Sequence, residues 1–276
     1  MPATTLPPWR ENGGRGLRRP AWRTLWQARE LVGFFALRDL RVRYKQAALG
    51  VVWVLLQPLA TVVIFTLVFS RLARVDSEGV PYPLFALVGM VVWTYLSGAV
   101  SRGSESLVNN PELVTKVDFP RIAAPAAAVL PGLADLLVSL LPVLALLVGY
   151  GRNPGWAALA LPLWLALAVL TGFGFSLWLA ALNVRFRDVR QALGPLLQIL
   201  LFASPVAYPS SLVPGWAGLV YALNPAVGII GLARWSLLGT PWPGWSLAVS
   251  VTVLLLVLGA GLVYFQRASR WFADVI

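Results

Sequence analysis

The residue types that carry most enzyme chemistry are scarce or missing in this chain. It has no histidine and no cysteine, which removes imidazole and thiolate metal ligands and thiol nucleophiles. Its eleven acidic residues are dispersed and form none of the usual paired-carboxylate spacings. No phosphate-binding loop precedes either of the two lysines, Lys45 and Lys116. We therefore expect no catalytic residue, no metal site and no cofactor bound by this chain.

Cationic side chains are the abundant chemistry, and their placement indicates a membrane. The formal charge is +11, but the chain is 58% hydrophobic and only 12% charged, unlike a water-soluble nucleic-acid-binding domain. Arg38, Arg41, Arg43 and Lys45 directly precede the uncharged apolar run 49–69. Such a junction predicts that the cations stay in the cytoplasm while the run crosses the bilayer. We expect no nucleic-acid partner.

Hydropathy predicts an all-α integral membrane protein. A helix of about 20 apolar residues crosses a bilayer. Spans are expected at about 49–69, 84–100, 122–149, 156–182, 192–208 and 245–265. Six spans place both termini in the cytoplasm, with only Arg71, Arg74, Arg152 and Arg234 of the 22 cations outside. This asymmetry is what the positive-inside rule predicts.

Residues 212–238 are also apolar and long enough to cross. They are interrupted by Pro214-Gly215, Gly218, Asn224-Pro225, Gly228 and Gly231. Broken backbone at membrane depth must be buried in protein or line a wet cavity. We expect a re-entrant pair of half-helices that enters from the outer side and returns, with Arg234 at the outer interface. The alternative is a seventh ordinary helix, which would put the tail outside.

The chain before the first span divides into two parts. Residues 21–45 show aromatic and aliphatic side chains at mostly helical spacing with arginines between them, a pattern typical of an interfacial amphipathic helix. Residues 1–20 are rich in Pro, Gly and Arg without periodicity, and we expect a disordered cytoplasmic tail rather than a cleavable signal peptide. Residues 21–276 then form one transmembrane domain.

A cytoplasmic loop carries a short helix signal. Asn109, Asn110, Pro111 and Glu112 supply a cap, a proline at the first helical position and an acid in the first turn. The helix 111–117 is too short to span and must lie across the cytoplasmic face. It either receives force from a soluble partner or is a solvated connector.

Two sets of residues inside the spans need an explanation. Asp135 lies mid-span, where a charge costs about 3 kcal/mol on insertion scales. It either faces a hydrated pathway or partner helix, or it is protonated or hydrogen-bonded to Ser139 or another helix's backbone. Aromatic rings within or near the spans are candidates to line a sugar channel, with ordinary packing as the alternative. These are Trp53, Trp93, Tyr95, Phe173, Phe175 and Trp178.

Three segments resemble the permease subunits of ABC exporters that move lipid-linked polysaccharides such as O-antigen, capsule and teichoic-acid precursors. They are Arg-Asp-Leu-Arg-Val-Arg-Tyr-Lys at 38–45 with Leu49-Gly50, Trp53 and Pro58; Asn-Val-Arg-Phe-Arg-Asp-Val at 183–189; and Ser-Pro-Val-Ala-Tyr-Pro at 204–209 with Asn224-Pro225 and Arg234.

The resemblance implies a homodimer in the bacterial cytoplasmic (inner) membrane, paired with two ATP-binding cassette subunits that hold ATP and Mg. It implies that the short helix docks on the ATPase, through Asn110, Pro111, Glu112, Leu113, Val114, Thr115 and Lys116. It also makes the cations Arg38, Arg41, Arg43, Lys45, Arg185 and Arg187 candidates to attract an anionic lipid headgroup. For each cation the alternative is simple retention on the cytoplasmic side.

Other functions stay open at this stage. An ABC permease for a drug or a small lipid would also use six spans and a coupling helix. A secondary transporter would work without ATP and depend on Asp135, and a lipid-modifying enzyme would turn over substrate alone. The sequence does not specify the sugar composition or length of a glycan substrate.

Overall fold

A computed structural model describes residues 21–45, 50–110, 120–186, 188–269 and 272. The predictions for residues 1–20, for Pro111 to Val117 and for Arg187 lie outside this part of the chain. Within it the fold is all helical, and five helices are long and apolar enough to cross a membrane. The protein is therefore an all-α integral membrane protein, as its hydropathy predicts.

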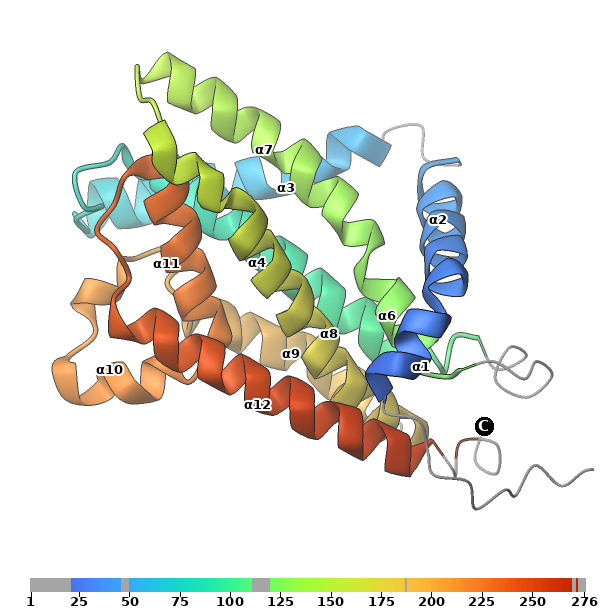
Figure 1. The fold of residues 1–276 in the computed structure, drawn as a ribbon. Helices are drawn as coiled ribbons and strands as arrows, with labels where there is room; N and C mark the ends of the chain where they lie inside the picture. Colours follow the sequence, from blue (N-terminus) through green and yellow to red (C-terminus); the bar gives the residue numbers. More distant parts are fainter. Residues whose placement is uncertain (1–20, 46–49, 111–119, 187, 270–271, 273–276) are drawn as a thin grey trace, which may run out of the picture.

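Figure 1 shows the helices in their spatial arrangement. In chain order they are α1 (Ala21–Gln27), α2 (Arg29–Lys45), α3 (Gly50–Phe65), the π-helix η1 (Thr66–Leu72), α4 (Tyr82–Glu105), α6 (Ala123–Val129), α7 (Pro131–Gly149), the 3₁₀ helix η2 (Gly155–Ala160), α8 (Leu161–Arg185), α9 (Asp188–Phe202), the 3₁₀ helix η3 (Ser210–Leu212), α10 (Gly215–Ala222), α11 (Pro225–Leu238) and α12 (Trp245–Ala268).

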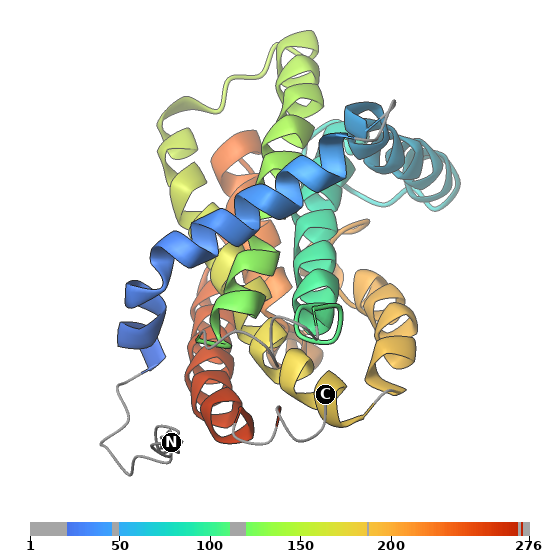
Figure 2. The same ribbon diagram turned by 90° about the vertical axis from the view of Figure 1, so that its right-hand side faces the viewer.

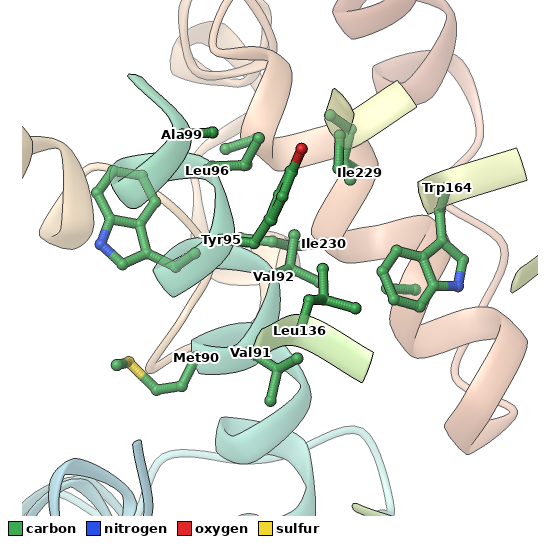
Figure 3. Packing of buried hydrophobic residues seen from close by; sticks show 14 of the residues in the cluster. Met90, Val91, Val92, Tyr95, Leu96, Ala99, Leu136, Trp164, Ile229 and Ile230 are labelled. Carbon is green, nitrogen blue, oxygen red and sulfur yellow. The ribbon is translucent and has the colours of Figure 1, made fainter. Parts of the chain in front are cut away.

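Helix α4 forms the centre of the bundle. Of the most apolar 18-residue stretch of α4, 78% is buried inside the chain, against 17% of the corresponding stretch of α12. Small residues let α8 approach closely, because a Cβ on Gly103 would lie 1.8 Å from the Ser176 hydroxyl oxygen and one on Gly172 would lie 2.8 Å from the Ala99 Cβ. In close-up, residues of α4 lie in one apolar cluster with residues of α7, α8 and α11 (Figure 3).

The observed helices reproduce four of the expected spans closely, at 84–100, 122–149, 156–182 and 245–265. The first span extends further, because the α-helix from Gly50 continues as a π-helix to Leu72.

The fifth expected span, 192–208, is wrong in its bounds. Helix α9 has 15 residues and ends at Phe202, and turns follow up to Val206. Pro205 disfavours helical backbone at Ser204, which accounts for the early end. At 1.5 Å per residue, α9 is about 22 Å long and falls short of a full crossing.

Residues 212–238 form two helices bent by 99° rather than one continuous helix. The break follows local rules, since the Asn224 side chain accepts a hydrogen bond of 3.0 Å from the Ala226 backbone N–H and Pro225 occupies the first turn of α11. Helix α11 ends where Gly239 takes a left-handed conformation with φ of 69°. The expected pair of half-helices is therefore present, while its dip from the outer face stays a prediction.

The amino-terminal helices lie across the bundle. Figure 2 shows α2 crossing the face that α6 and α7 present, and only Phe35 of α2 is buried there. Large apolar side chains on the other sides of α1 and α2 remain exposed, among them Trp26, Phe34 and Val42. The helix predicted over 21–45 is thus present with a turn at Ala28, and its place in a lipid interface remains a prediction.

Candidate functional site

A polar cavity of about 450 Å³ lies between the carboxyl end of α2 and helices α3, α4 and α7. Its polar lining comes from Arg43, Tyr44, Gln57, Thr94, Tyr95, Ser97, Arg102, Asp135 and Ser139. A smaller cavity of about 190 Å³ shares Arg43 and Arg102 with it and adds Arg38, Asp39 and Asn110. Charged and polar side chains inside an apolar helix bundle are costly unless they are paired or hydrated, and they commonly mark a ligand site or a pathway. This cavity is therefore the candidate functional site.

Asp135 is held in this cavity by two side chains of α2. Its carboxylate lies 2.5 Å from an Arg43 guanidinium nitrogen and accepts a hydrogen bond from the Tyr44 hydroxyl. Burial, followed by this hydrogen bond, raises the pKa of Tyr44 to about 12. Ser139 donates to the Asp135 backbone oxygen at 2.8 Å rather than to its carboxylate. The charge of Asp135 is therefore compensated by Arg43, a pairing that sequence reasoning missed because 92 residues separate the two.

Arg102 was not among the sequence candidates, although the structure places it in both cavities. Its Nε donates a hydrogen bond of 3.4 Å to the Ala128 backbone oxygen. A Cβ on Gly98 would lie 2.9 Å from one of its terminal nitrogens, and a Cβ on Gly132 would lie 2.2 Å from the other. Two glycines thus leave the room that the guanidinium occupies. The sequence offered one indication of this position: an arginine in the last turn of an apolar helix, four residues after a glycine.

Arg38 links α2 to the start of the expected coupling segment. It forms an ion pair of 2.8 Å with Asp39 and donates a 3.5 Å hydrogen bond to the Asn110 side-chain oxygen. Asn110 in turn donates to the Ser106 backbone oxygen at 3.0 Å, just beyond α4. Asn110 is the single coupling candidate that falls within the described residues.

The remaining cationic candidates do not gather with Arg43. Arg41 and Lys45 are exposed on α2. Arg185 lines a separate cavity of about 500 Å³ with Tyr264 and Arg267, at the ends of α8 and α12. The structure thus brings Arg38 and Arg43 together with Arg102, and leaves Arg185 elsewhere.

Most of the aromatic candidates are packed inside the chain. Trp93, Tyr95 and Phe173 are buried, and the Tyr95 hydroxyl donates to the Val129 backbone oxygen at 3.2 Å. Phe175 and Trp178 are half-buried. Trp178 donates to the Val257 backbone oxygen at 3.0 Å and stacks on Tyr264 with ring centroids 4.7 Å apart. The side chain of Trp53 lies outside the described residues. Tyr95 borders the polar cavity, and a channel-lining role for the six stays a prediction.

Arg234, which the sequence placed at the outer interface, is buried within the chain, and its depth in the membrane stays a prediction. The residue is 3% exposed and donates to the backbone oxygens of Phe85 at 3.2 Å and Val206 at 2.8 Å. Its guanidinium carbon lies 3.4 Å from the centroid of the Phe85 ring. Most of helix α11 is buried, in contact with α12, α4 and α8. The Arg234 side chain turns inward and fastens α11 to α4 and to the turn after α9.

The sequence relationships match this helical architecture. A family model described as ABC-2 type transporter matches residues 30–238, from α2 through α11. The chain belongs to the ABC-2 type transporter family. The O-antigen export system permease protein RfbA of Myxococcus xanthus is 32% identical over 211 residues, 75% of this chain and 80% of that protein. A protein of the same name from Klebsiella pneumoniae is 25% identical over 194 residues, 70% of this chain and 74% of that protein.

The ABC-2 region includes every residue that lines the two polar cavities, since all of them fall between Phe35 and Ser139. It also includes Arg234 and its partners. Residues 1–29 and 239–276, which include α1 and α12, lie beyond it. The candidate site is therefore built within the family's own membrane domain.

Proposed function

We propose that this chain is the membrane-spanning subunit of an ATP-driven exporter that moves lipid-linked polysaccharide across the bacterial cytoplasmic membrane. The observation that carries the proposal is the basic cavity between α2, α4 and α7 within an ABC-2 membrane domain. A lipid-linked glycan carries an anionic phosphate headgroup, and arginines are suited to hold phosphate oxygens. The names of the Myxococcus and Klebsiella relatives support a polysaccharide rather than a drug or a simple lipid as the cargo.

The proposed assembly is a homodimer with two separate ATP-binding subunits, the ATP and Mg being held by those partners. Closure of the ATPases pushes the segment 110–116 of each permease and opens a path between the first and fifth spans of facing copies. The bond from Arg38 to Asn110 supports this route, because it joins the coupling segment directly to α2 and thus to the cavity wall. Both termini and the cavity then lie on the cytoplasmic side.

The first test is purification of the tagged protein from its native host in mild detergent, with mass spectrometry of what accompanies it. We expect a stoichiometric ATP-binding subunit, lost when Glu112 and Leu113 are replaced by alanine. Arg152→Gln, on a loop at the far end of α7, is the matched control and should retain the partner. Recovery of the chain alone with transport intact would contradict the proposal and favour a secondary transporter.

A second test identifies the cargo. Deletion in the native host should remove a surface polysaccharide and leave its lipid-linked form inside the cell. Normal surface glycan in the deletion strain, with accumulation of a drug or of a simple lipid instead, would assign the ABC permease to that smaller substrate.

A further inference from the structure

Arg102 is a cation that forms no ion pair within the described part of the chain. Among the described residues its hydrogen bond to the Ala128 backbone oxygen, at 3.4 Å, is long, and none of the ion pairs involves it. The nearby carboxylate of Asp135 lies 2.5 Å from Arg43 and is already engaged. The larger cavity therefore holds two guanidinium groups and one carboxylate, an excess of one positive charge in an apolar bundle.

We propose that Arg102, with Arg43 beside it, is the binding site for the phosphate oxygens of the transported lipid, within the cavity between α2, α4 and α7. This inference rests on the proposed function and adds the residue that receives the headgroup. A planar guanidinium can donate two parallel hydrogen bonds to phosphate oxygens. Its cavity is far larger than the space that one water needs, so a phosphate group and the first atoms of a lipid tail fit.

The glycines beside Arg102 indicate a built site. Gly98 comes from α4 and Gly132 from α7, and a methyl group on either would collide with the guanidinium, at 2.9 Å and 2.2 Å. Two independent helices thus leave space for the same charged group. Glycine in the interior of a helix costs roughly 1 kcal/mol relative to alanine. If Arg102 served only to keep the adjoining loop on one side of the membrane, its guanidinium would not need the space beside Gly98 and Gly132.

The helix itself directs Arg102 toward the cavity. Arg102 lies in the last turn of α4, and its guanidinium sits at the level of Gly98, one turn before it. Side chains of an α-helix tilt toward the N-terminus of the helix, so the charge runs back along α4. It thereby reaches the cavity that Arg43 and Asp135 also line.

The test is equilibrium binding to the purified full-length permease, with its partner subunits where they copurify, followed by thermal unfolding with added ligand. The probes are farnesyl diphosphate, farnesol and inorganic pyrophosphate. Farnesyl diphosphate should stabilise the wild-type protein, and farnesol should not. Arg102→Gln should weaken binding of farnesyl diphosphate by about 10-fold or more, since it removes a charge-assisted contact. Arg102→Lys, which keeps the charge and loses the fork, should lose less.

Gly132→Ala is the sharper variant, because it leaves every charge in place and displaces the guanidinium by steric overlap. We expect it to weaken binding, though less than Arg102→Gln does, because the shifted guanidinium keeps its charge. Its matched control is Gly259→Ala in α12, where an added Cβ meets nothing within 4 Å. Arg71→Gln, at the exposed end of η1, is the control for loss of one positive charge. Both controls should bind like the wild type, and unfolding without ligand checks that each variant is folded.

The outcomes separate the inference from the function. Wild-type affinity in folded Arg102→Gln or Gly132→Ala would overturn the site. If inorganic pyrophosphate bound as tightly as farnesyl diphosphate, the lipid would be refuted as the ligand of the Arg102 site. The site would then be one for free phosphate anions. Loss of surface polysaccharide on deletion, with no binding of farnesyl diphosphate by the wild type, would refute the inference while the export function stands.

Discussion

Two arginines point from central helices into the interior of this protein, and their surroundings differ. Arg234 of α11 donates to two backbone oxygens and lies over the Phe85 ring, and a Cβ on Gly89 would lie 2.8 Å from one of its terminal nitrogens. Arg102 of α4 also lies against glycines, yet within the described residues it makes one hydrogen bond, of 3.4 Å, and it faces the polar cavity. Arg234 lines a cavity too, of about 370 Å³, so a position at a cavity does not separate the two. The difference lies in the hydrogen bonds: a well-satisfied cation supports the fold, whereas one with a single long hydrogen bond is available to a ligand.

The strongest test of this contrast is Arg234→Gln. The change should lower the free energy of unfolding by about 3 kcal/mol, because the buried oxygens of Phe85 and Val206 lose a charged donor. Thermal unfolding in detergent and the yield of folded protein measure the effect. Arg267→Gln at the exposed end of α12 is the control and should change neither. A melting temperature equal to that of the wild type would remove the structural role of Arg234.

Arg102→Gln should show the reverse pattern. We expect export of surface polysaccharide to fall by about 10-fold, in line with a lost phosphate contact. The melting temperature should stay within a few degrees of the wild type, since the substitution removes an uncompensated charge. Export is measured by surface glycan at matched protein levels in the membrane. If Arg102→Gln unfolded the protein as Arg234→Gln does, the two arginines would share one role.

Asp135→Asn tests the neighbour of Arg102. Loss of the Arg43 ion pair should cost about 1 kcal/mol, because the Arg43 side chain is 41% exposed and water screens the pair. Farnesyl diphosphate should bind a few-fold more tightly, since Arg43 is then free to contact phosphate, and export should persist. Abolished transport with normal folding would instead support the secondary transporter that depends on Asp135.

Tyr44→Phe should give the smallest effect, visible at alkaline pH. Burial and the hydrogen bond to Asp135 raise the pKa of Tyr44 from 10.0 to about 12, so folding favours the protonated phenol. Its contribution to stability is complete below about pH 10 and is lost as the pH rises toward 12. The melting temperature of the wild type should therefore fall more steeply from pH 10 to 12 than that of Tyr44→Phe. Parallel slopes would contradict the burial of this hydroxyl.

Much of the fold was predictable because it depends on local chemistry. Apolar length identified four spans closely, and the order of turn residues identified the broken pair at 212–238. The Asn224 cap and Pro225 act within a few residues, so their effect is readable from the chain. The bounds of the fifth span were wrong because hydropathy continues through Pro205, whereas the backbone does not continue as a helix.

The candidate site was predictable only in part. The cations predicted at 38–45 include Arg38 and Arg43, which line the two cavities, and Asp135 was recognised as a charge that needed an explanation. The sequence did not reveal that Arg43 is the partner of Asp135 or that Arg102 lies in the same cavity. Both depend on tertiary packing, because α2, α4 and α7 are far apart in the sequence and meet only in the fold. The six aromatic candidates could not be assigned from the sequence, because the residue type alone does not indicate which side of a helix is buried within the chain.

The sequence by itself determined that this protein lies in a membrane and that its spans are helices. A run of about 20 apolar residues can satisfy its backbone groups in a bilayer only as a helix. It also determined where those helices begin and break, through proline, asparagine and glycine at specific positions. The tertiary structure alone decided which charges are satisfied. Arg102 and Arg234 are the same residue type in similar apolar helices, and each lines a cavity. Among the described residues, packing gives Arg234 two backbone oxygens and leaves Arg102 with one long hydrogen bond, so the first fastens helices together and the second can bind a ligand.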